Sequence, residues 1–367
     1  MTVRRRAPEL LATVPAWVTA RVAVAAGAAL AAVLAATALS DHTVLGLVSW
    51  DGDWYRRIAE SGYDGLPEEA LRFFPLYPLL ASALAPLFLG SESAALVAIT
   101  SGSALAAMAL LRRLVLLEGH DPALATRSVW LLALFPAAFV LVLAYAEGLL
   151  LALVIGAFLM VRRRRWWGAA LLGLLAALTR PVGVVVAVAV AVEAARAWRV
   201  AQGPERLAMV AAAIGPLAGL AAYLTWVGVR FDDPWLPLTV QEGEFRGDFV
   251  DPVTRMARAA TDLLSFDGDR MADGLHLPFA LAFIALLVVV FRRWPASYGA
   301  YAAVLLAVAL AADNLNSLER YGLNAFPLVL GLASVTRGRL AQRAALGVCG
   351  AAMVGLTCLA LLGEYVP

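Results

Sequence analysis

Long apolar runs recur along the whole chain, and short polar breaks separate them. Of the 367 residues, 62% are hydrophobic and only 15% are charged, whereas soluble proteins average roughly 45 to 50% apolar and about 25% charged residues. A chain of this kind needs a lipid bilayer as its solvent. Runs of this length satisfy their backbone hydrogen bonds in a bilayer as helices. We therefore predict an all-α polytopic membrane protein in which residues 1–367 form a single transmembrane domain.

The first apolar run, residues 16–39, follows Arg4, Arg5 and Arg6. It is longer than the apolar segment of about 7 to 15 residues in a cleaved signal peptide, so we interpret it as a retained signal anchor with a cytoplasmic N-terminus. With the helices that follow, we predict about 10 to 11 transmembrane crossings. The further predicted helices cover residues 93–111, 128–144, 147–161, 166–179, 182–198, 207–229, 278–291, 298–312, 322–336 and 344–362.

The arginines indicate which way these helices point. All 29 basic residues are arginine, which hints at a GC-rich bacterial genome, and the cytoplasmic ends of membrane helices are enriched in basic residues. We therefore expect a multi-pass protein of a bacterial plasma membrane, and we expect the run 162–165 only to orient the chain. The predicted helices place all of these clusters on the cytoplasmic side: Arg112 and Arg113; residues 162–165; Arg196, Arg199 and Arg206; Arg292 and Arg293; and Arg337, Arg339 and Arg343.

Two longer polar stretches, residues 40–92 and 230–277, are predicted as extracytoplasmic loops. The first loop includes an apolar segment, residues 73–90, that carries Pro75, Pro78 and Pro86. Each proline removes a backbone donor and disturbs a helix, and a crossing here would reverse every later arginine cluster. We therefore assign this segment to the outer interface or to a half-buried hairpin.

The remaining ionisable residues in or near apolar runs all fall on the outer side. Charge at membrane depth costs at least a few kcal/mol per residue, and such residues usually face a cavity and serve a function. The pattern predicts one extracytoplasmic site near the ends of short helices, which suits a substrate with an apolar tail and a polar head. These residues are Asp51, Asp53, Glu147, Arg180, Asp313, Glu319 and Arg320.

The first loop contains the segment Trp50-Asp51-Gly52-Asp53-Trp54-Tyr55. A carboxylate there can act as a general base or ligate a metal, and aromatic faces pack against sugar rings. An aromatic belt at the membrane interface, with solvated acids, explains the same composition equally well.

In family order, the segments WDGDWYRRIAESGYDG, RFFPLYPLL, AYAEG, LTRPVG and ERYGLNAFPL resemble the PIG-V type of mannosyltransferase and its bacterial relatives. The resemblance runs from about residue 50 to 330. It implies the GT-C fold of membrane glycosyltransferases, which take a sugar from a polyprenyl-phosphate carrier on the non-cytoplasmic face. It also implies that Asp51 is catalytic and that Asp53 is a more variable second acid. By the same resemblance, substrate-binding candidates are Tyr145 and Glu147 in a Tyr-x-Glu element, Arg180 in an Arg-x-x-Gly element, and Arg320 with Tyr321.

The chemistry of the residues is compatible with this expectation. Sugar transfer from a lipid phosphate needs a base for the acceptor hydroxyl, for which we name Asp51, and cations for the departing phosphate. Arg320 and Arg180 are candidates because a guanidinium grips phosphate with parallel hydrogen bonds. The expected reaction moves mannose from polyprenyl-phosphate mannose to a glycolipid or glycan of the cell envelope, with inversion. Glu147 paired with Arg180, and Arg320 paired with Glu319 or Asp313, remain structural alternatives.

Other features leave more than one interpretation open. In the second loop, Trp235 and Gln241 are candidates for substrate recognition, and His276 either caps the next helix or touches substrate. Asp51 and Asp53 have the DxD spacing of metal-dependent glycosyltransferases, but arginines can neutralise a lipid phosphate, so we expect no obligatory metal and no cofactor. A basic stripe interleaved with aromatic residues is absent, so nucleic acid is not an expected partner. The rival function is a transporter or flippase for lipid-linked saccharides.

Overall fold

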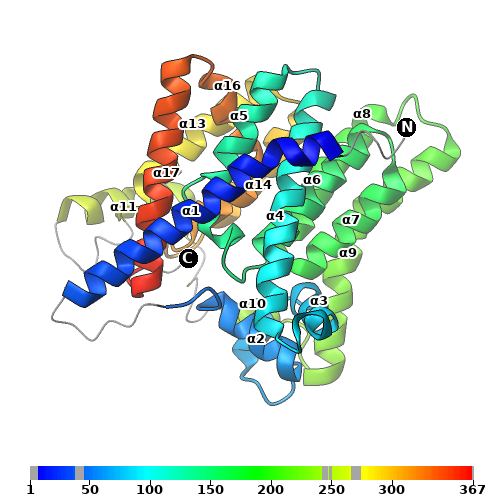
Figure 1. The fold of residues 1–367 in the computed structure, drawn as a ribbon. Helices are drawn as coiled ribbons and strands as arrows, with labels where there is room; N and C mark the ends of the chain where they lie inside the picture. Colours follow the sequence, from blue (N-terminus) through cyan, green and yellow to red (C-terminus); the bar gives the residue numbers. More distant parts are fainter. Residues whose placement is uncertain (1–6, 38–44, 242–246, 248–249, 266–273, 366–367) are drawn as a thin grey trace.

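The computed structural model describes residues 7–37, 45–241, 247, 250–265 and 274–365. Within these ranges the chain is almost entirely helical and contains no β-strand, which confirms the predicted all-α class (Figure 1). The α-helices are α1 (Ala7–Thr37), α2 (Asp51–Ser61), α3 (Leu76–Leu84), α4 (Glu92–Leu117), α5 (Pro122–Ala133), α6 (Glu147–Arg162), α7 (Trp166–Thr179), α8 (Val186–Ala197), α9 (Gly203–Phe231), α10 (Leu236–Gln241), α11 (Pro252–Ser265), α13 (Leu277–Arg293), α14 (Ala296–Leu310), α15 (Leu318–Asn324), α16 (Pro327–Val335) and α17 (Arg339–Leu362). The short 3-10 helices are η2 (Glu68–Arg72), η3 (Ala85–Phe88), η4 (Ala138–Leu141) and η5 (Pro181–Val185).

Four of the described helices are long and apolar enough to cross a bilayer, namely α1, α4, α9 and α17. The protein is therefore a multi-pass membrane protein. The helices α6 and α7 hold 16 and 14 residues, or about 24 and 21 Å of helix against a hydrocarbon core of about 30 Å. Both are as short as the sequence indicates. The segment α3 and η3, Leu76–Phe88, is likewise shorter than the four candidate spans.

Several predicted helices are interrupted, and the prediction of one continuous helix over residues 128–144 is wrong. Helix α5 ends at Ala133 because Pro136 disfavours the helical conformation in the residue before it and has no backbone donor. The chain then continues as buried irregular backbone with the single turn η4 as far as α6. The predicted helix 322–336 is also divided, into α15 and α16: Ala325 leaves the helical conformation, with a ψ angle of 56°, and Pro327 begins α16, where a backbone donor is not needed.

One end of the bundle gathers the arginine-rich helix ends. Arg162 at the end of α6 binds Glu118 at 2.6 Å and Glu193 of α8 at 2.9 Å. Ser297 and Tyr298, at the start of α14, donate hydrogen bonds to Glu193 and Glu118. These contacts bring together the predicted cytoplasmic ends of four helices. Because α6 runs from Glu147 to Arg162, its first residue lies about 24 Å away, at the opposite end.

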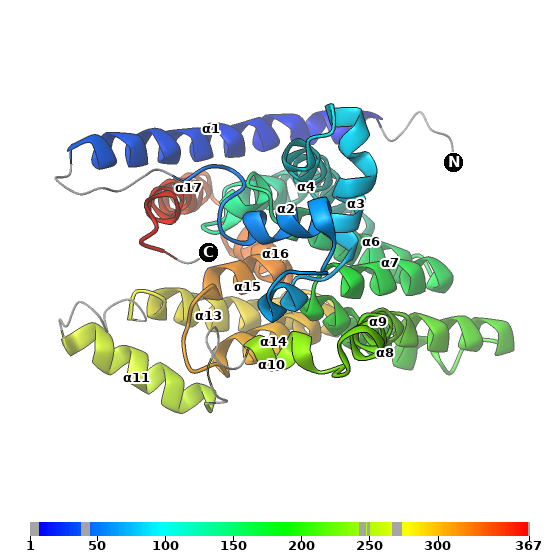
Figure 2. The ribbon, with the colours of Figure 1, turned by 90° about the horizontal axis from the view of Figure 1, so that it is seen from below.

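The first predicted extracytoplasmic loop lies at that opposite end, where α2, α3 and α10 gather at the lower edge of Figure 1. Viewed from that side, α2 lies near the centre of the molecule, with α15 beside it and α11 at the periphery (Figure 2). The start of α2 packs closely on the irregular segment before α6, since a Cβ at Gly52 would lie 3.2 Å from the carbonyl oxygen of Ala144. The indole of Trp50 donates to the carbonyl of Ala360 at the end of α17. Both contacts hold the acidic end of α2 against the bundle.

Candidate active site

Four charged side chains from distant parts of the sequence meet beneath α2. Arg320 of α15 contacts Asp51 at 2.5 Å, and Arg180 contacts Glu147 at 2.6 Å. Longer contacts connect the two pairs, at 3.7 Å between Arg180 and Asp51 and at 3.5 Å between Arg320 and Glu147. The structure thus brings together the catalytic candidate and three of the predicted substrate-binding residues in one ion network.

Each of these side chains is placed by the end of a helix. Asp51 and Glu147 are the first residues of α2 and α6, where the positive end of the helix dipole favours a carboxylate. Arg180 follows the last residue of α7 and is extended, because Pro181 disfavours the helical conformation in the residue before it. Arg320 lies in the first turn of α15, after Ser317.

Two residues that precede these helices have strained backbones. Trp50 before α2 and Ser317 before α15 have φ angles of 56° and 65°. Residues other than glycine rarely adopt positive φ angles. Such conformations persist only where the surrounding structure enforces them, and they cluster at functional sites. The two helix starts that carry Asp51 and Arg320 are therefore held in specific orientations.

The ion network is deeply buried. Glu147 is fully inaccessible, and the side chains of Asp51, Arg180 and Arg320 are between 11 and 18% exposed. Although they are ion-paired, both carboxylate oxygens of Glu147 and the Nε atom of Arg180 have no aligned hydrogen-bond partner among the described residues. The hydroxyl of Tyr145, fully buried beside them, has none there either. Buried polar atoms usually have aligned partners, so this unaligned geometry distinguishes the network from an ordinary structural ion pair.

The charge in this network is predominantly positive around Asp51. Burial by itself raises the pKa of the Asp51 carboxyl, but three neighbouring guanidinium groups, of which Arg320 has the largest effect, hold that pKa below its usual value. The third of these groups is Arg72, at the end of η2. The site thus holds three cations, Arg320, Arg180 and Arg72, and two anions, Asp51 and Glu147. This excess of positive charge suits an additional anionic group such as a phosphate.

Arg72 was not among the residues predicted for the site. In the sequence it opens the segment RFFPLYPLL, which reads as an interfacial anchor, and its guanidinium does lie 4.8 Å from the ring centre of Phe73. The predicted topology also puts other arginines on the outer side, such as Arg56, Arg57 and Arg230, so no signal in the sequence singled out Arg72. Its closeness to Asp51 depends on the fold of the first loop.

The aromatic residues of the first loop mainly hold α2 in place. Tyr55 is buried and meets Phe73 and Tyr77 edge-on, at 5.1 and 4.8 Å between ring centres, while Trp54 stacks on Phe73 at 5.7 Å. Tyr145 differs, because its ring lies 5.7 Å from the guanidinium of Arg320. The hydroxyls of both Tyr55 and Tyr145 interact with the charges of the ion network.

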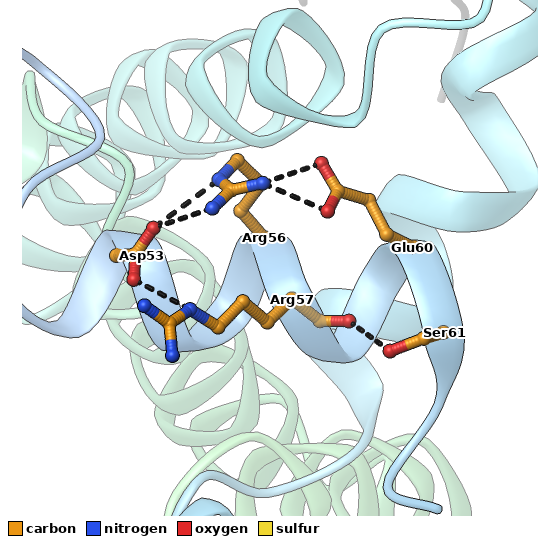
Figure 3. A network of polar contacts seen from close by, with 5 residues as sticks. All are labelled: Asp53, Arg56, Arg57, Glu60 and Ser61. Carbon is orange, nitrogen blue, oxygen red and sulfur yellow. Dashed lines mark hydrogen bonds and ion pairs between the residues drawn. The ribbon is translucent and has the colours of Figure 1, made fainter. Parts of the chain in front are cut away.

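Asp53 occupies a different face of α2 from Asp51. Its two carboxylate oxygens bind Arg56 at 2.7 Å and Arg57 at 2.8 Å, and Arg56 also binds Glu60 (Figure 3). Positions two apart on a helix point in nearly opposite directions, so the two acids of the DxD segment do not converge. Within the described ranges, no group of three or more His, Cys, Asp or Glu side chains is arranged to hold a metal ion.

The two candidates from the second loop, Trp235 and Gln241, make no ion pair or hydrogen bond to the ion network within the described residues. Trp235 is 58% exposed, and the amide of Gln241 donates to the carbonyl of Pro237 in its own helix. Helix α10, which contains Gln241, packs against η2. Tyr321 is half-buried against the main apolar core.

Two structural alternatives for Arg320 are wrong. Its neighbour Glu319 binds His276 at 2.8 Å, and Asp313 contacts Arg258 at 3.4 Å. His276 stands just before α13 but makes no capping hydrogen bond with its side chain. The alternative in which Glu147 pairs with Arg180 describes a contact that is present, inside the same network as Asp51.

Comparison with known proteins places the chain in a family. The model of glycosyltransferase family 87 matches residues 75–314, about two thirds of the chain. This range contains Glu147 and Arg180, whereas Asp51 and Arg320 lie outside it. The narrower resemblance to the PIG-V type is not confirmed, and a search of curated proteins found no match.

Among solved structures, the chain is similar to the Archaeoglobus fulgidus oligosaccharyltransferase in complex with Zn and sulfate. The identity is 14% and the TM-score is 0.45 over 94% of this chain and 53% of that chain. This chain therefore spans about half the length of that enzyme. The family match, which covers well over half of the residues, establishes that the chain belongs to glycosyltransferase family 87.

Proposed function

We propose that this membrane glycosyltransferase transfers mannose from polyprenyl-phosphate mannose to a glycolipid or glycan of the cell envelope. The observation that carries the proposal is the buried network in which three arginines surround Asp51. Such a network suits a substrate whose phosphate becomes more negative as it leaves. Membership in a glycosyltransferase family supports sugar transfer, and the all-helical architecture is compatible with a GT-C fold. Mannose as the sugar rests on the PIG-V resemblance.

In the proposed reaction, Asp51 takes the proton of an acceptor hydroxyl. The hydroxyl oxygen forms a bond to the anomeric carbon, and the bond between that carbon and the phosphate oxygen breaks. Its electron pair leaves with polyprenyl phosphate, whose added negative charge Arg320, Arg180 and Arg72 stabilise. Direct attack inverts the anomeric carbon, so a β-linked donor gives an α-mannoside.

The ion pair between Asp51 and Arg320 implies that the donor binds before the acceptor is activated. A carboxylate held at 2.5 Å by a guanidinium is a weaker base than a free one. A donor phosphate that binds Arg320 competes with Asp51 for the same hydrogen-bond donors. Donor binding therefore releases the base, and the acceptor hydroxyl is activated only when a donor is present.

The proposed location is the extracytoplasmic face of a bacterial plasma membrane. The support is the arrangement of charge along the bundle, since the arginine-rich helix ends and the ion network lie at opposite ends of α6. Cytoplasmic ends carry the excess of basic residues in most membrane proteins. The N-terminus is then cytoplasmic, and the donor lipid reaches the site from the outer leaflet.

A transfer assay tests the proposal. Purified protein is supplied with radiolabelled polyprenyl-phosphate mannose and envelope lipids, and labelled products are separated from the donor. We expect Asp51→Asn to lower the rate at least about 100-fold, in the usual range for loss of a general base, while the protein remains folded. The matched control is Glu60→Gln on the same helix, which removes an exposed carboxylate that binds Arg56.

Two outcomes would contradict the proposal. Substantial activity in Asp51→Asn removes this residue from the role of base. Movement of the labelled lipid across a vesicle without a new glycosidic bond supports the rival transporter or flippase.

A further inference from the structure

A second buried cluster lies beside the ion network and is not used by the proposed reaction. The carboxylate of Glu319 contacts the Nδ1 atom of His276 at 2.8 and 3.0 Å and accepts a hydrogen bond from the Tyr365 hydroxyl at 2.9 Å. Glu319 is 1% exposed and His276 is 6% exposed. A buried carboxylate with this set of partners is well satisfied, so Glu319 has one defined orientation.

Glu319 connects segments that are far apart in the sequence. His276 lies just before α13 at the end of the second outer loop, and Tyr365 follows α17. The ring of Tyr365 also contacts His276 and Phe139 of η4, at 6.0 and 6.4 Å between ring centres. Burial and the adjacent Glu319 carboxylate raise the pKa of Tyr365, so its hydroxyl remains a donor.

The residue after Glu319 is Arg320, which contacts Asp51 and Glu147. Neighbouring positions on a helix point about 100° apart, so α15 presents one residue to each cluster. This helix has only seven residues, fewer than an isolated helix needs to be stable. It also starts after Ser317 with a left-handed backbone and no side-chain cap. Contacts outside the helix must therefore set its rotation. On the side facing away from the ion network, Glu319 supplies two of them through His276 and Tyr365, and the Asn324 carbonyl accepts a further hydrogen bond from Tyr301.

We propose that Glu319, held by His276 and Tyr365, is a positioning residue that fixes the direction from which the Arg320 guanidinium meets the donor phosphate. This inference rests on the proposed function in one respect, the phosphate-bearing ligand. A guanidinium binds phosphate with two parallel hydrogen bonds and tolerates little rotation. A small rotation of α15 then weakens phosphate binding without removing any group that touches the ligand.

The test measures binding of polyprenyl phosphate, the leaving group, to the purified full-length protein. The variants are Glu319→Gln, Arg320→Lys and the double variant, with Tyr365→Phe as a milder change at the same cluster. Glu193→Gln is the matched control, because Glu193 is a buried acid bonded to Arg162 and Ser297 at the other end of the bundle. Donor and acceptor KM values are measured for the same proteins.

We expect Glu319→Gln to weaken polyprenyl phosphate binding about tenfold in the wild-type background and less than about threefold in Arg320→Lys, because residues that act through one another are not additive. Tyr365→Phe should weaken binding in the same direction and raise the donor KM, with the acceptor KM unchanged. Glu193→Gln should lower thermal stability without changing binding.

Additive losses in the double variant would overturn the inference, and so would equal changes in both KM values. If Glu319→Gln does not fold, the same comparison with Tyr365→Phe decides the question. A wild-type protein that binds polyprenyl phosphate but transfers no mannose contradicts the proposed function. The comparison of polyprenyl phosphate binding by the single and double variants then still tests the role of Glu319. A wild-type protein that does not bind polyprenyl phosphate contradicts both.

Discussion

Replacing Arg180 by methionine removes the closest cation of a fully buried carboxylate. Glu147 has 0% exposure, and its nearest cation is Arg180 at 2.6 Å. Breaking a buried ion pair from one side typically costs 3 to 5 kcal/mol, because a charge remains in a medium of low polarity. Glu147 keeps Arg320 at 3.5 Å, so we expect the lower end of that range, about 3 kcal/mol. For a chain of this size that corresponds to a melting temperature roughly 4 °C lower.

The double variant Arg180→Met/Glu147→Gln separates stability from activity. It leaves no unpaired charge, and buried ion pairs replaced on both sides are often neutral in stability. The melting temperature of the double variant should therefore return close to that of the wild type. Both variants should lose the proposed mannosyl transfer, because the donor phosphate would lose a guanidinium.

Thermal unfolding in one detergent, followed by tryptophan fluorescence, measures both variants. The control is Arg164→Met, which breaks a pair with Glu205 of similar length, 2.8 Å, at an exposed position. Exposed ion pairs contribute little, so the control should melt close to the wild type. If Arg180→Met melts like the wild type, or the double variant is as unstable as the single one, the argument from buried charge is refuted.

Three further outcomes are expected. Since the folded pKa of Asp51 lies below its unfolded value of about 3.9, its carboxylate stays ionised and stabilises the fold above that pH. This contribution is lost as the pH falls through the folded pKa, so the acidic limb of the kcat/KM profile should lie below about pH 4, and a limb near pH 6 would contradict it. Activity should survive exhaustive chelation, whereas a loss restored by Mg²⁺ or Mn²⁺ would show a metal requirement. Gly148→Ala places a Cβ 2.7 Å from the carbonyl oxygen of Thr100 and should destabilise the protein by about 1 to 3 kcal/mol. The control is Gly102→Ala, where nothing lies within 4 Å of the added Cβ. Equal melting temperatures of the two variants would contradict this prediction.

The helix interruptions show a limit of reading hydropathy along the chain. Apolar residues continue through residues 134–146 and across Pro327, so the pattern predicts continuous helices there. In the structure these segments are broken, and all residues of 134–146 are buried. Irregular backbone is tolerated at membrane depth where protein surrounds it. Hydropathy reports burial in an apolar environment but does not distinguish lipid from protein.

Asp51 and Asp53 show the same limit within the site. Two residues apart in one motif, they bind different arginines on different faces of α2. Arg72, directly before the segment predicted to lie at the membrane interface, was given no role and lies close to Asp51. Glu319 was considered as a partner of Arg320 and binds His276 instead. In each case the type of residue indicated that it would form polar contacts, but the sequence did not predict which residue would be its partner.

The amino-acid sequence by itself determined that this protein is helical and membrane-embedded, because the requirement to bury apolar side chains and to satisfy every backbone group acts on each run of residues locally. It also placed arginine clusters and isolated charges at alternate ends of those runs. Only the tertiary structure decided which charges pair, because Asp51, Glu147, Arg180 and Arg320 come from four separate helix ends. Ion pairs form at distances of 2.5 to 3.7 Å here, and such distances depend on how helices pack and where they break.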